Sequence, residues 1–297
     1  MLSILIPTYN YSTLKLVQEL HKQATSENIK FEILVLDDAS NNLEIKNENE
    51  AINLLSNCSF SCNEINIGRA ANLNKLVKKS HYNNCLLLEA DAFPENKTYI
   101  KKYLEIINNK IDVAFGGVIY KDKKPKSNSL LRWIYGHKRE SKSLDLRLKK
   151  PNKLIFSWNL LISKQLILKF PFDESIKKYG FEDLIFLKKL ENNNVKIHQF
   201  NNNCFHNNEE TSMVFIEKYN SSLQNLKLLL DCKKLNYDDT SLSYLYLKIK
   251  NLKLQNLIIW IFNITEKLLL KNLISKNCSL VVFDFYKLGY FCKINSK

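Results

Sequence analysis

Three pairs of acidic residues stand where carboxylates could do chemistry. They are Asp37 with Asp38, Glu89 with Asp91, and Glu182 with Asp183. The first pair follows an apolar run in VLDDAS (35–40), and carboxylates there can accept hydrogen bonds from a ribose hydroxyl or a base N–H. An ordinary turn or helix cap is the alternative, because Asp and Ser suit both. This pair alone therefore leaves a nucleotide contact open.

The second pair could hold a metal ion. In LLLEADAFP (86–94) a buried strand leads to two acids whose spacing lets both carboxylates reach one cation. Mg²⁺ and Mn²⁺ prefer oxygen ligands and often share them with phosphates. Two neighbouring acids without a partner repel each other, so a metal or a basic group is a natural companion. The alternative is a pair of solvated acids that lead into the turn at Pro94.

The third pair opens an expected helix in YGFEDLIF (179–186). One of these carboxylates could take a proton from an acceptor hydroxyl, while the apolar face formed by Leu184, Phe186 and Leu187 holds it still. Acids are also favourable in any first helical turn, through the helix dipole and capping. Both interpretations stay open for this pair.

His206 and a basic stretch are the remaining candidates. His206 follows the extended segment 195–205, and imidazole suits Mn²⁺ and similar ions, although an isolated His is usually an ordinary polar residue. Residues 121–153 hold twelve Lys or Arg and three acids. This stretch could bind a diphosphate or an acidic acceptor, or be a solvated loop. Nucleic-acid motifs such as zinc-finger spacing or an aromatic RNP signature are absent, so no nucleic-acid partner is expected.

The elements that must position these residues alternate between strand and helix. Apolar runs predict strands at 2–6, 31–36, 58–65, 85–88, 113–120 and 154–162. Helical spacing predicts helices at 12–24, 68–80, 97–108 and 181–191. This alternation indicates an α/β protein with a mostly parallel sheet, in which ligands bind beyond the carboxyl ends of the strands. Segments 7–10, 37–40 and 89–91 follow such strands.

From about residue 209 the pattern becomes helical. Helices are predicted at 215–230, 242–250 and 254–273. We therefore expect a catalytic domain over 1–206 and a helical C-terminal extension over 207–297. The helix at 254–273 is mostly apolar, with lysines and aromatic residues. It could lie on an anionic membrane surface or pack against the catalytic domain.

Composition excludes several classes of protein. The 297 residues carry a net charge of +14 and are 45% hydrophobic, as in a globular chain, and six Gly and five Pro are too few for a collagenous or low-complexity chain. Seven scattered cysteines do not form a disulfide framework. No basic leader segment precedes Pro7, and no apolar run reaches the roughly 18 residues of a membrane span. A cytoplasmic protein is expected, with peripheral contact to the inner face of the membrane as a further hypothesis.

The order of the motifs resembles that of a family 2 glycosyltransferase with the GT-A fold. The motifs are SILIPTYNY, EILVLDDAS, NIGRAANLN, LLLEADAFP, YGFEDLIF and then His206, within residues 1–206. LLRWIYGHKRE and FSWNLLISK resemble a bacterial subgroup of that family. The resemblance implies a mostly parallel sheet flanked by helices, with a Rossmann-like nucleotide-binding half and a helical appendage.

The resemblance also implies roles for individual residues. The donor nucleotide would be contacted by Pro7, Thr8, Tyr9, Asp37, Asp38, Arg69 and Asn74, with Asp38 on the uracil or its ribose. Glu89 and Asp91 occupy the DXD positions that hold the metal and the diphosphate, and His206 falls where many members place a third metal ligand. Asp183 would be the catalytic base, with Glu182 beside it at the acceptor.

The implied reaction is an inverting transfer from a nucleotide sugar, with UDP expected, that uses Mn²⁺ or Mg²⁺. The acceptor would be a hydroxyl of a cell-surface saccharide or of a lipid-linked molecule. Three departures from the family pattern are the Glu at 89, Leu73 in place of an Arg, and the polar run before His206. An inactive binding or scaffold protein is therefore an alternative. A sugar nucleotidyltransferase is another, although SILIPTYNY lacks that class's glycine-rich signature.

Overall fold

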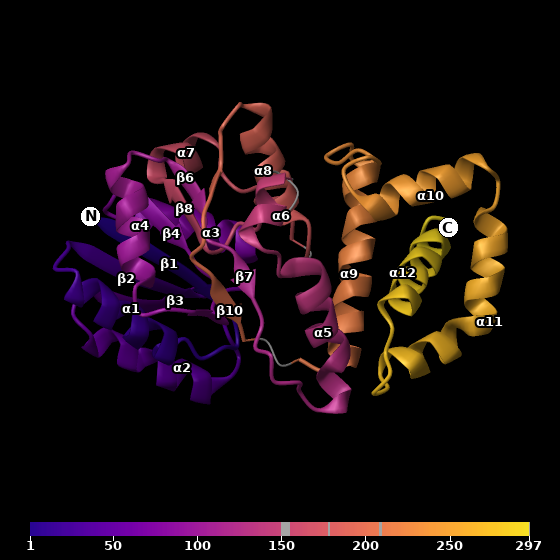
Figure 1. Ribbon diagram of the computed structural model, residues 1–297, viewed down its shortest axis with the longest axis horizontal. Helices are drawn as coiled ribbons and strands as arrows, with labels where there is room; N and C mark the ends of the chain where they lie inside the picture. Colours follow the sequence, from indigo (N-terminus) through magenta and orange to yellow (C-terminus); the bar gives the residue numbers. More distant parts are fainter. Residues whose placement is uncertain (150–154, 178, 208–209, 297) are drawn as a thin grey trace. The chain divides into compact units, whose positions relative to one another are not determined.

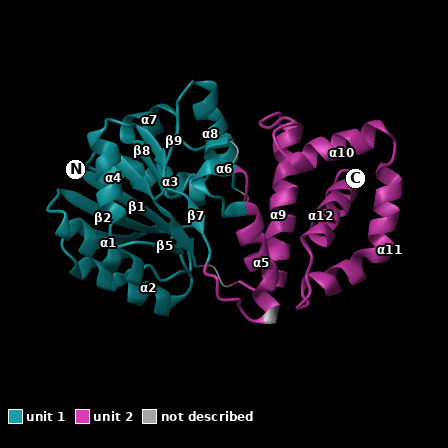
Figure 2. Ribbon diagram, viewed as in Figure 1, with its two compact units in different colours: residues 1–120, 140–177, 182–208 teal, residues 121–139, 178–181, 209–297 magenta. Residues whose placement is uncertain are grey.

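The computed structural model describes residues 1–149, 155–177, 179–207 and 210–296 (Figure 1). The chain folds into two compact units (Figure 2). Unit 1 comprises residues 1–120, 140–177 and 182–208, and unit 2 comprises 121–139, 178–181 and 209–297. The domain boundary expected between 206 and 207 stays a prediction. The end of the basic stretch (150–153) and the first residue of the strand expected at 154–162 lie outside the described residues.

Unit 1 is built on a seven-stranded, mostly parallel sheet, which confirms the predicted fold class (Figure 1). Its order is β3-β2-β1-β4-β8-β6-β9. The strands are β1 (Leu2–Thr8), β2 (Phe31–Asp37), β3 (Cys58–Cys62), β4 (Asn84–Leu87), β6 (Val113–Phe115), β8 (Leu160–Ser163) and β9 (His198–Gln199). Only β8 runs antiparallel to its neighbours. All seven residues of β1 are buried, as its continuous apolar run predicts for a central strand.

The strand order reverses direction between β1 and β4, the position at which α/β sheets commonly bind ligands. From β1 the chain moves outward to β2 and β3, and it then returns past them to β4 on the other side of β1. Such a reversal opens a crevice at the carboxyl ends of the two central strands. Because crossovers are right-handed, it also puts the helix before β4 on the opposite face from the helix after β1. The loops after Thr8 and Leu87 therefore border this position.

Helices cover the sheet in unit 1. They are α1 (Leu14–Ser26), α2 (Leu43–Glu50), α3 (Arg69–Lys79), α4 (Tyr99–Asn108), α6 (Leu144–Lys149), α7 (Lys164–Lys169) and α8 (Glu182–Asn192). α1 packs beside α4, and α3 packs beside α7. A second sheet of three short strands has the order β5 (Ala92–Pro94), β10 (Cys204–His206), β7 (Val118–Ile119). It pairs Ala92 with His206 and so brings two distant parts of the chain together.

Three predicted strands are shorter than expected, and the one expected at 58–65 ends at Cys62. The run 113–120 is split at Gly116–Gly117 into β6 and β7, which belong to different sheets. Gly117 has a φ of 105°, and a Cβ on Gly116 would lie 2.3 Å from the Asn202 carbonyl oxygen, so both positions need glycine. In the run 154–162, strand β8 begins only at Leu160, because Asn159 adopts a positive φ of 52°.

Unit 2 is helical in the part that the structure describes. It contains α5 (Leu130–Tyr135), α9 (Ser212–Asp231), α10 (Ser241–Asn251), α11 (Gln255–Leu273) and α12 (Leu280–Ile294). Its core includes Leu131, Phe215, Phe262, Leu273, Phe283 and Tyr286. Thr211 and Thr240 cap α9 and α10 through their side chains. Among the described helices, none is both long enough and apolar enough to cross a membrane.

Candidate active site

Arg69 joins three of the predicted acidic residues into one cluster in unit 1. Its Nε donates to Glu89 Oε1 at 2.7 Å, and its Nη1 donates to Asp183 Oδ1 at 2.7 Å. Glu182 Oε1 lies 3.9 Å from the same Nη1. Residues 20 and 114 positions apart in the chain therefore meet on one guanidinium. We call Arg69, Glu89, Glu182 and Asp183 the Arg69 cluster.

The loop before α3 holds Arg69 in place. Gly68 is the N-cap residue with a φ of 85°, a conformation that a side chain would strain. The Asp38 carboxylate accepts hydrogen bonds from the backbone N–H groups of Ile67 (2.9 Å) and Gly68 (2.8 Å), and from Asn63 Nδ2 (2.9 Å). Asp38, predicted to contact the nucleotide, thus fixes the start of the helix that carries Arg69.

Asp183 is held on one side only. Its Oδ1 accepts from Arg69 Nη1 and from the Ser157 hydroxyl, and Ser157 Oγ in turn accepts from Arg69 Nη2 at 3.1 Å. No described residue donates to Oδ2, and the side chain is 28% exposed. The residue lies in the first turn of α8, immediately after a turn in which Gly180 and Phe181 have positive φ. One oxygen is therefore fixed while the other can accept an external proton.

The Arg69 cluster carries excess negative charge. Burial raises the pKa of the Glu89 carboxyl despite the guanidinium beside it, and the nearby Asp91 and Asp183 charges act in the same direction. Burial likewise raises the pKa of Glu182, whose Oε2 is buried without a hydrogen-bond partner among the described residues. Burial alone would lower the pKa of Arg69, but the Asp183, Glu89 and Glu182 carboxylates raise it. One guanidinium thus faces several carboxylates, so a second cation nearby would be stabilised by the remaining negative charge.

Asp91 and His206 form a second pair next to the Arg69 cluster. Asp91 Oδ2 lies 3.5 Å from His206 Nε2, and the two side chains are 16% and 13% exposed. The β5–β10 pairing and the Asn207 N–H bond to the Asp91 carbonyl (2.8 Å) fix their separation. The rings of Tyr120 and Trp158 lie 5.5 Å from the imidazole. A carboxylate oxygen and an imidazole nitrogen at this distance fit two adjacent positions around a divalent cation such as Mn²⁺.

The remaining predicted nucleotide residues end β1 and β2. Pro7 and Thr8 are buried, whereas Tyr9 is 51% exposed. Thr8 pairs with Asp37 in the sheet, and the Asp37 carboxylate accepts from the Ser40 N–H at 2.9 Å and from the Ser40 hydroxyl. Both acids of the VLDDAS motif therefore organise the loops at this edge of the sheet. Of this group, Tyr9 presents the largest exposed surface.

Asn74 makes its contacts away from the Arg69 cluster. Its side-chain N–H groups donate to the Phe172 carbonyl and to Glu174 Oε1, each at 2.9 Å, and its Oδ1 accepts from the Phe172 N–H at 3.1 Å. The side chain is buried and joins α3 to the segment that precedes α8. Its described hydrogen bonds are thus made within the protein.

Two buried polar residues, one of them in contact with the Arg69 cluster, were not singled out from the sequence. Ser157 is fully buried, and its hydroxyl touches both Arg69 and Asp183. Asn159 is fully buried and accepts from the Tyr99 hydroxyl at 2.6 Å and the Tyr103 hydroxyl at 2.8 Å, which fixes the loop before β8. The available signal was the occurrence of Ser and Asn inside the otherwise apolar run IFSWNLLI, since buried polar groups need partners.

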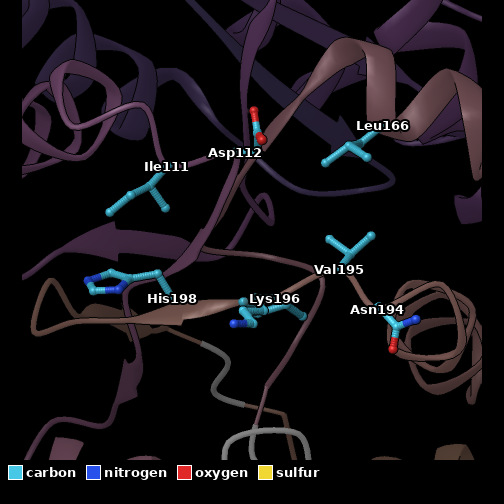
Figure 3. A pocket seen from close by; sticks show the side chains of 8 residues that line it. Ile111, Asp112, Leu166, Asn194, Val195, Lys196 and His198 are labelled. Carbon is cyan, nitrogen blue, oxygen red and sulfur yellow. The ribbon is translucent and has the colours of Figure 1, made fainter.

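A hollow of about 600 Å³ lies elsewhere on unit 1 (Figure 3). It is lined by Ile111, Asp112, Leu166 and the segment 194–198, and the side chains of Lys196 and His198 are among those exposed around it. None of these residues belongs to the Arg69 cluster or to the Asp91–His206 pair. The hollow is therefore separate from the candidate active site.

Comparison with solved structures supports the same fold. A Pyrobaculum calidifontis mannosyltransferase solved with GDP-Man and Mn²⁺ has a TM-score of 0.54 and 14% identity, over 77% of this chain and 64% of that one. S. aureus TarS 1–349 solved with UDP-GlcNAc has a TM-score of 0.51 and 17% identity, over 100% and 92%. GalNAc-T7 solved with UDP, GalNAc and Mn²⁺ has a TM-score of 0.53 and 15% identity, over 71% and 43%. At these identities the likeness shows the fold, which is of the GT-A type.

The chain spans only part of some of these proteins, covering 39% of a longer TarS chain. A search of curated proteins found no match. The model of the family described as "Glycosyl transferase family 2" matches residues 3–169, which is more than half of the sequence. That match includes the loops that carry Asp38, Arg69, Glu89 and Asp91 at the carboxyl ends of the central strands. The chain therefore belongs to glycosyl transferase family 2.

Proposed function

We propose that this chain transfers a sugar from a nucleotide diphosphate donor, with inversion, to an acceptor hydroxyl. The observation that carries the proposal is the Arg69 cluster, in which Glu89 and Asp183 from distant loops share one guanidinium. The reversal of strand order between β1 and β4 supports it, because ligands bind at such a position in α/β sheets. The folds shared with enzymes solved with UDP-GlcNAc and with GDP-Man agree with a nucleotide-sugar donor.

Asp183 is the proposed base. Ser157 and Arg69 hold its Oδ1, so Oδ2 accepts the proton of the acceptor hydroxyl. The acceptor oxygen forms a bond to the anomeric carbon as the bond from that carbon to the diphosphate oxygen breaks, and the bonding pair leaves with the nucleoside diphosphate. Attack from the face opposite the leaving group inverts the anomeric centre. Glu182 borders the acceptor side through its place beside Asp183.

Asp91 and His206 are the proposed protein ligands of a divalent cation, Mn²⁺ or Mg²⁺, with Glu89 close to them. Among the described residues, no three His, Cys, Asp or Glu side chains form a metal site by themselves. Two protein ligands leave coordination positions for diphosphate oxygens, as Mg²⁺ and Mn²⁺ often require. When bound, the cation would offset the negative charge of the leaving diphosphate. In the protein, Arg69 holds the Glu89 carboxylate by donating to its Oε1.

The proposed nucleotide contacts come from the loops after β1 and β2. Tyr9 offers an exposed ring beside the backbone of Pro7 and Thr8, and a base can stack on such a ring. Asp37 and Asp38 are buried, and their carboxylates hold the loops that would carry the contacts to the base and the ribose. The proposed donor is a UDP-sugar. The proposed acceptor is a hydroxyl of a cell-surface saccharide or of a lipid-linked precursor.

Two variants test the proposal. Asp183→Asn should lower kcat at least about a hundredfold while the Kd for UDP stays unchanged, because a base is lost but no donor contact. Asp91→Asn should weaken UDP binding only when Mn²⁺ is present, because it removes a cation ligand. Titration calorimetry with UDP, with and without Mn²⁺, measures both effects on binding. Transfer is followed as UDP release from a panel of UDP-sugars.

The alternatives give different results. A scaffold protein would bind none of the UDP-, GDP- or dTDP-sugars in a metal-dependent manner. A sugar nucleotidyltransferase would release pyrophosphate from a nucleoside triphosphate and a sugar phosphate. Either result would remove the glycosyl-transfer proposal.

A further inference from the structure

An uncovered apolar stripe runs along α11 in unit 2. Leu257, Trp260, Ile264 and Leu268 are 49%, 62%, 61% and 69% exposed. They are spaced by three and four residues, so at about 100° per residue they fall within roughly 80° of the helix circumference. Single exposed apolar residues are common, but four on one side of one helix form a surface. We call these four residues the α11 stripe.

The packing of unit 2 explains why this side stays uncovered. Phe262 and Leu273 are fully buried and lie about half a turn around the helix from the stripe. α11 packs against α12 on that buried side, where Gly289 lets the helices approach: a Cβ there would lie 2.3 Å from the Phe262 ring. One side of α11 is thus buried within unit 2, and the side that carries the stripe is exposed.

The surroundings of the stripe are basic. Between residues 241 and 283 the sequence has one acidic residue, Glu266, which pairs with Lys293 of α12 at 3.1 Å. The same segment has six lysines, all exposed: Lys248, Lys250, Lys253, Lys267, Lys271 and Lys276. On the helical wheel Lys267 lies at the edge of the stripe, and Lys271 continues the same side of the helix beyond Leu268. An apolar surface with basic residues beside it is complementary to a partner that has an apolar interior and negatively charged groups at its surface.

We propose that the α11 stripe docks this protein on an anionic phospholipid bilayer, with α11 lying parallel to the surface. Apolar side chains would enter the headgroup boundary, Trp260 would lie at its polar edge, and the lysines would face lipid phosphates. No described helix has the character of a membrane span, which agrees with a helix that lies on the surface. The proposal does not depend on the catalytic proposal, because none of these residues belongs to the candidate active site.

Flotation of the full chain with lipid vesicles tests it. The protein should float with vesicles that contain phosphatidylglycerol and should stay behind with pure phosphatidylcholine, and raising the salt concentration should weaken the binding. Trp260→Gln/Ile264→Gln should reduce the partition coefficient at least about tenfold, because two inserted side chains are lost. The matched control is Leu43→Gln/Leu54→Gln, which removes two apolar side chains of 70% and 86% exposure from unit 1 and should float like the wild type.

Two charge-reversal variants distinguish binding through the lysines of α11 from attraction by the net charge of the whole chain. Lys267→Glu/Lys271→Glu should weaken binding by more than about fivefold for each lysine. Lys22→Glu/Lys78→Glu changes the net charge equally, at exposed positions of α1 and α3, and should change binding far less. Circular dichroism melting checks that all variants fold.

Several results would overturn the proposal. One is wild-type protein that does not float with anionic vesicles at low salt. Another is flotation that both charge-reversal pairs reduce equally, which would show attraction by net charge alone. A third is shielding of Trp260 from acrylamide in the lipid-free protein. Its exposure is measured as the difference in fluorescence quenching between the wild type and Trp260→Phe. If sedimentation then showed a dimer that Trp260→Gln/Ile264→Gln dissociates, a second copy of the chain would be the occupant instead.

Discussion

At the scale of single residues, Arg69 connects the acids of the candidate active site. It donates to Glu89, Asp183 and Ser157, while its predicted place beside the nucleotide stays a prediction. Its guanidinium has donors in a planar fork, so it can orient several carboxylates at once, which a lysine could not do. Ser157 closes this arrangement by bonding to both Arg69 and Asp183. The proposed base is therefore oriented by two partners.

Replacing Ser157 by Ala should lower kcat about tenfold and leave the KM for the donor unchanged. The variant loses one hydrogen bond that orients Asp183, and about 1.4 kcal/mol of barrier corresponds to that factor. Steady-state kinetics with saturating acceptor measures both constants. Ser157→Thr keeps a hydroxyl and should recover most of the rate. An equal loss in both variants would show that packing at this buried site, rather than the hydroxyl, sets the rate.

Replacing Asn74 by Ala should lower the free energy of unfolding by about 1–3 kcal/mol without changing the Kd for UDP. The variant leaves the Phe172 N–H and carbonyl without their partner in a buried place. Urea unfolding and calorimetry measure the two quantities. Lys78→Ala, at an exposed site near the end of α3, is the control for stability. A large loss of UDP affinity with unchanged stability would instead support the nucleotide contact predicted from the family pattern.

At the scale of elements, the short strands and helix ends place the chemistry. Sheet pairing through β5 and β10 sets Asp91 beside His206. α8 begins with Glu182 and Asp183, and Phe186 from the same helix stacks on Phe172 with ring centroids 3.9 Å apart. In unit 2, the contact between α11 and α12 depends on one glycine. Each of these contacts fixes an element whose sequence alone would allow other positions.

Gly289→Ala should destabilise unit 2, although Ala favours a helix. The new Cβ would lie 2.3 Å from the Phe262 ring, so α11 and α12 would have to separate, at about 1–3 kcal/mol of unfolding free energy. Thermal melting followed by circular dichroism measures the loss. Phe262→Leu makes the neighbouring side chain smaller. Gly289→Ala should therefore lower the unfolding free energy less when it is added to Phe262→Leu than when it is added to the wild type. Additive losses would show that the two residues do not press on each other.

At the scale of the whole molecule, the chain carries an excess of positive charge although its candidate active site is acidic. The +14 net charge resides largely in lysines, whereas the Arg69 cluster and Asp91 form a negative centre. Such a distribution suits a protein that binds a metal diphosphate at one place and anionic surfaces at another. The stability of the fold depends in part on ionised side chains, so the free energy of unfolding should vary with pH.

Glu32 should contribute stability that is lost in acid. Burial of Glu32 acts to raise its pKa, but hydrogen bonds from His81 and Ser3 outweigh burial and lower the pKa below its usual value of 4.5. A lowered folded-state pKa stabilises the fold above pH 4.5 and loses this effect as the pH falls through the folded value. The difference in unfolding free energy between wild type and Glu32→Gln should thus be full near neutral pH and shrink in acid. Urea unfolding across that range measures it, and a constant difference would contradict the assignment.

The sequence by itself determined the fold class, and it predicted the three acids that meet at Arg69. A short continuous apolar run that ends at a turn is typical of a strand buried on both faces, which is why β1 and β2 were predicted nearly to their ends. The acidic motifs after those strands had to meet at one edge, because parallel strands end together. The helices at 43–50 and 280–294 were not predicted, because the first is short and polar and the second is apolar on nearly every side.

Only the tertiary structure decided which partner each acid takes. A carboxylate after a strand can bind a ligand, a loop or a cation, and local pattern does not distinguish these. Asp38 bonds to the loop before α3, Glu89 bonds to Arg69, and Asp91 lies beside His206. The same holds for the α11 stripe, since the apolar helix became one-sided only when α12 covered Phe262 and Leu273. Such choices depend on contacts between residues far apart in the chain, which single-sequence patterns do not encode.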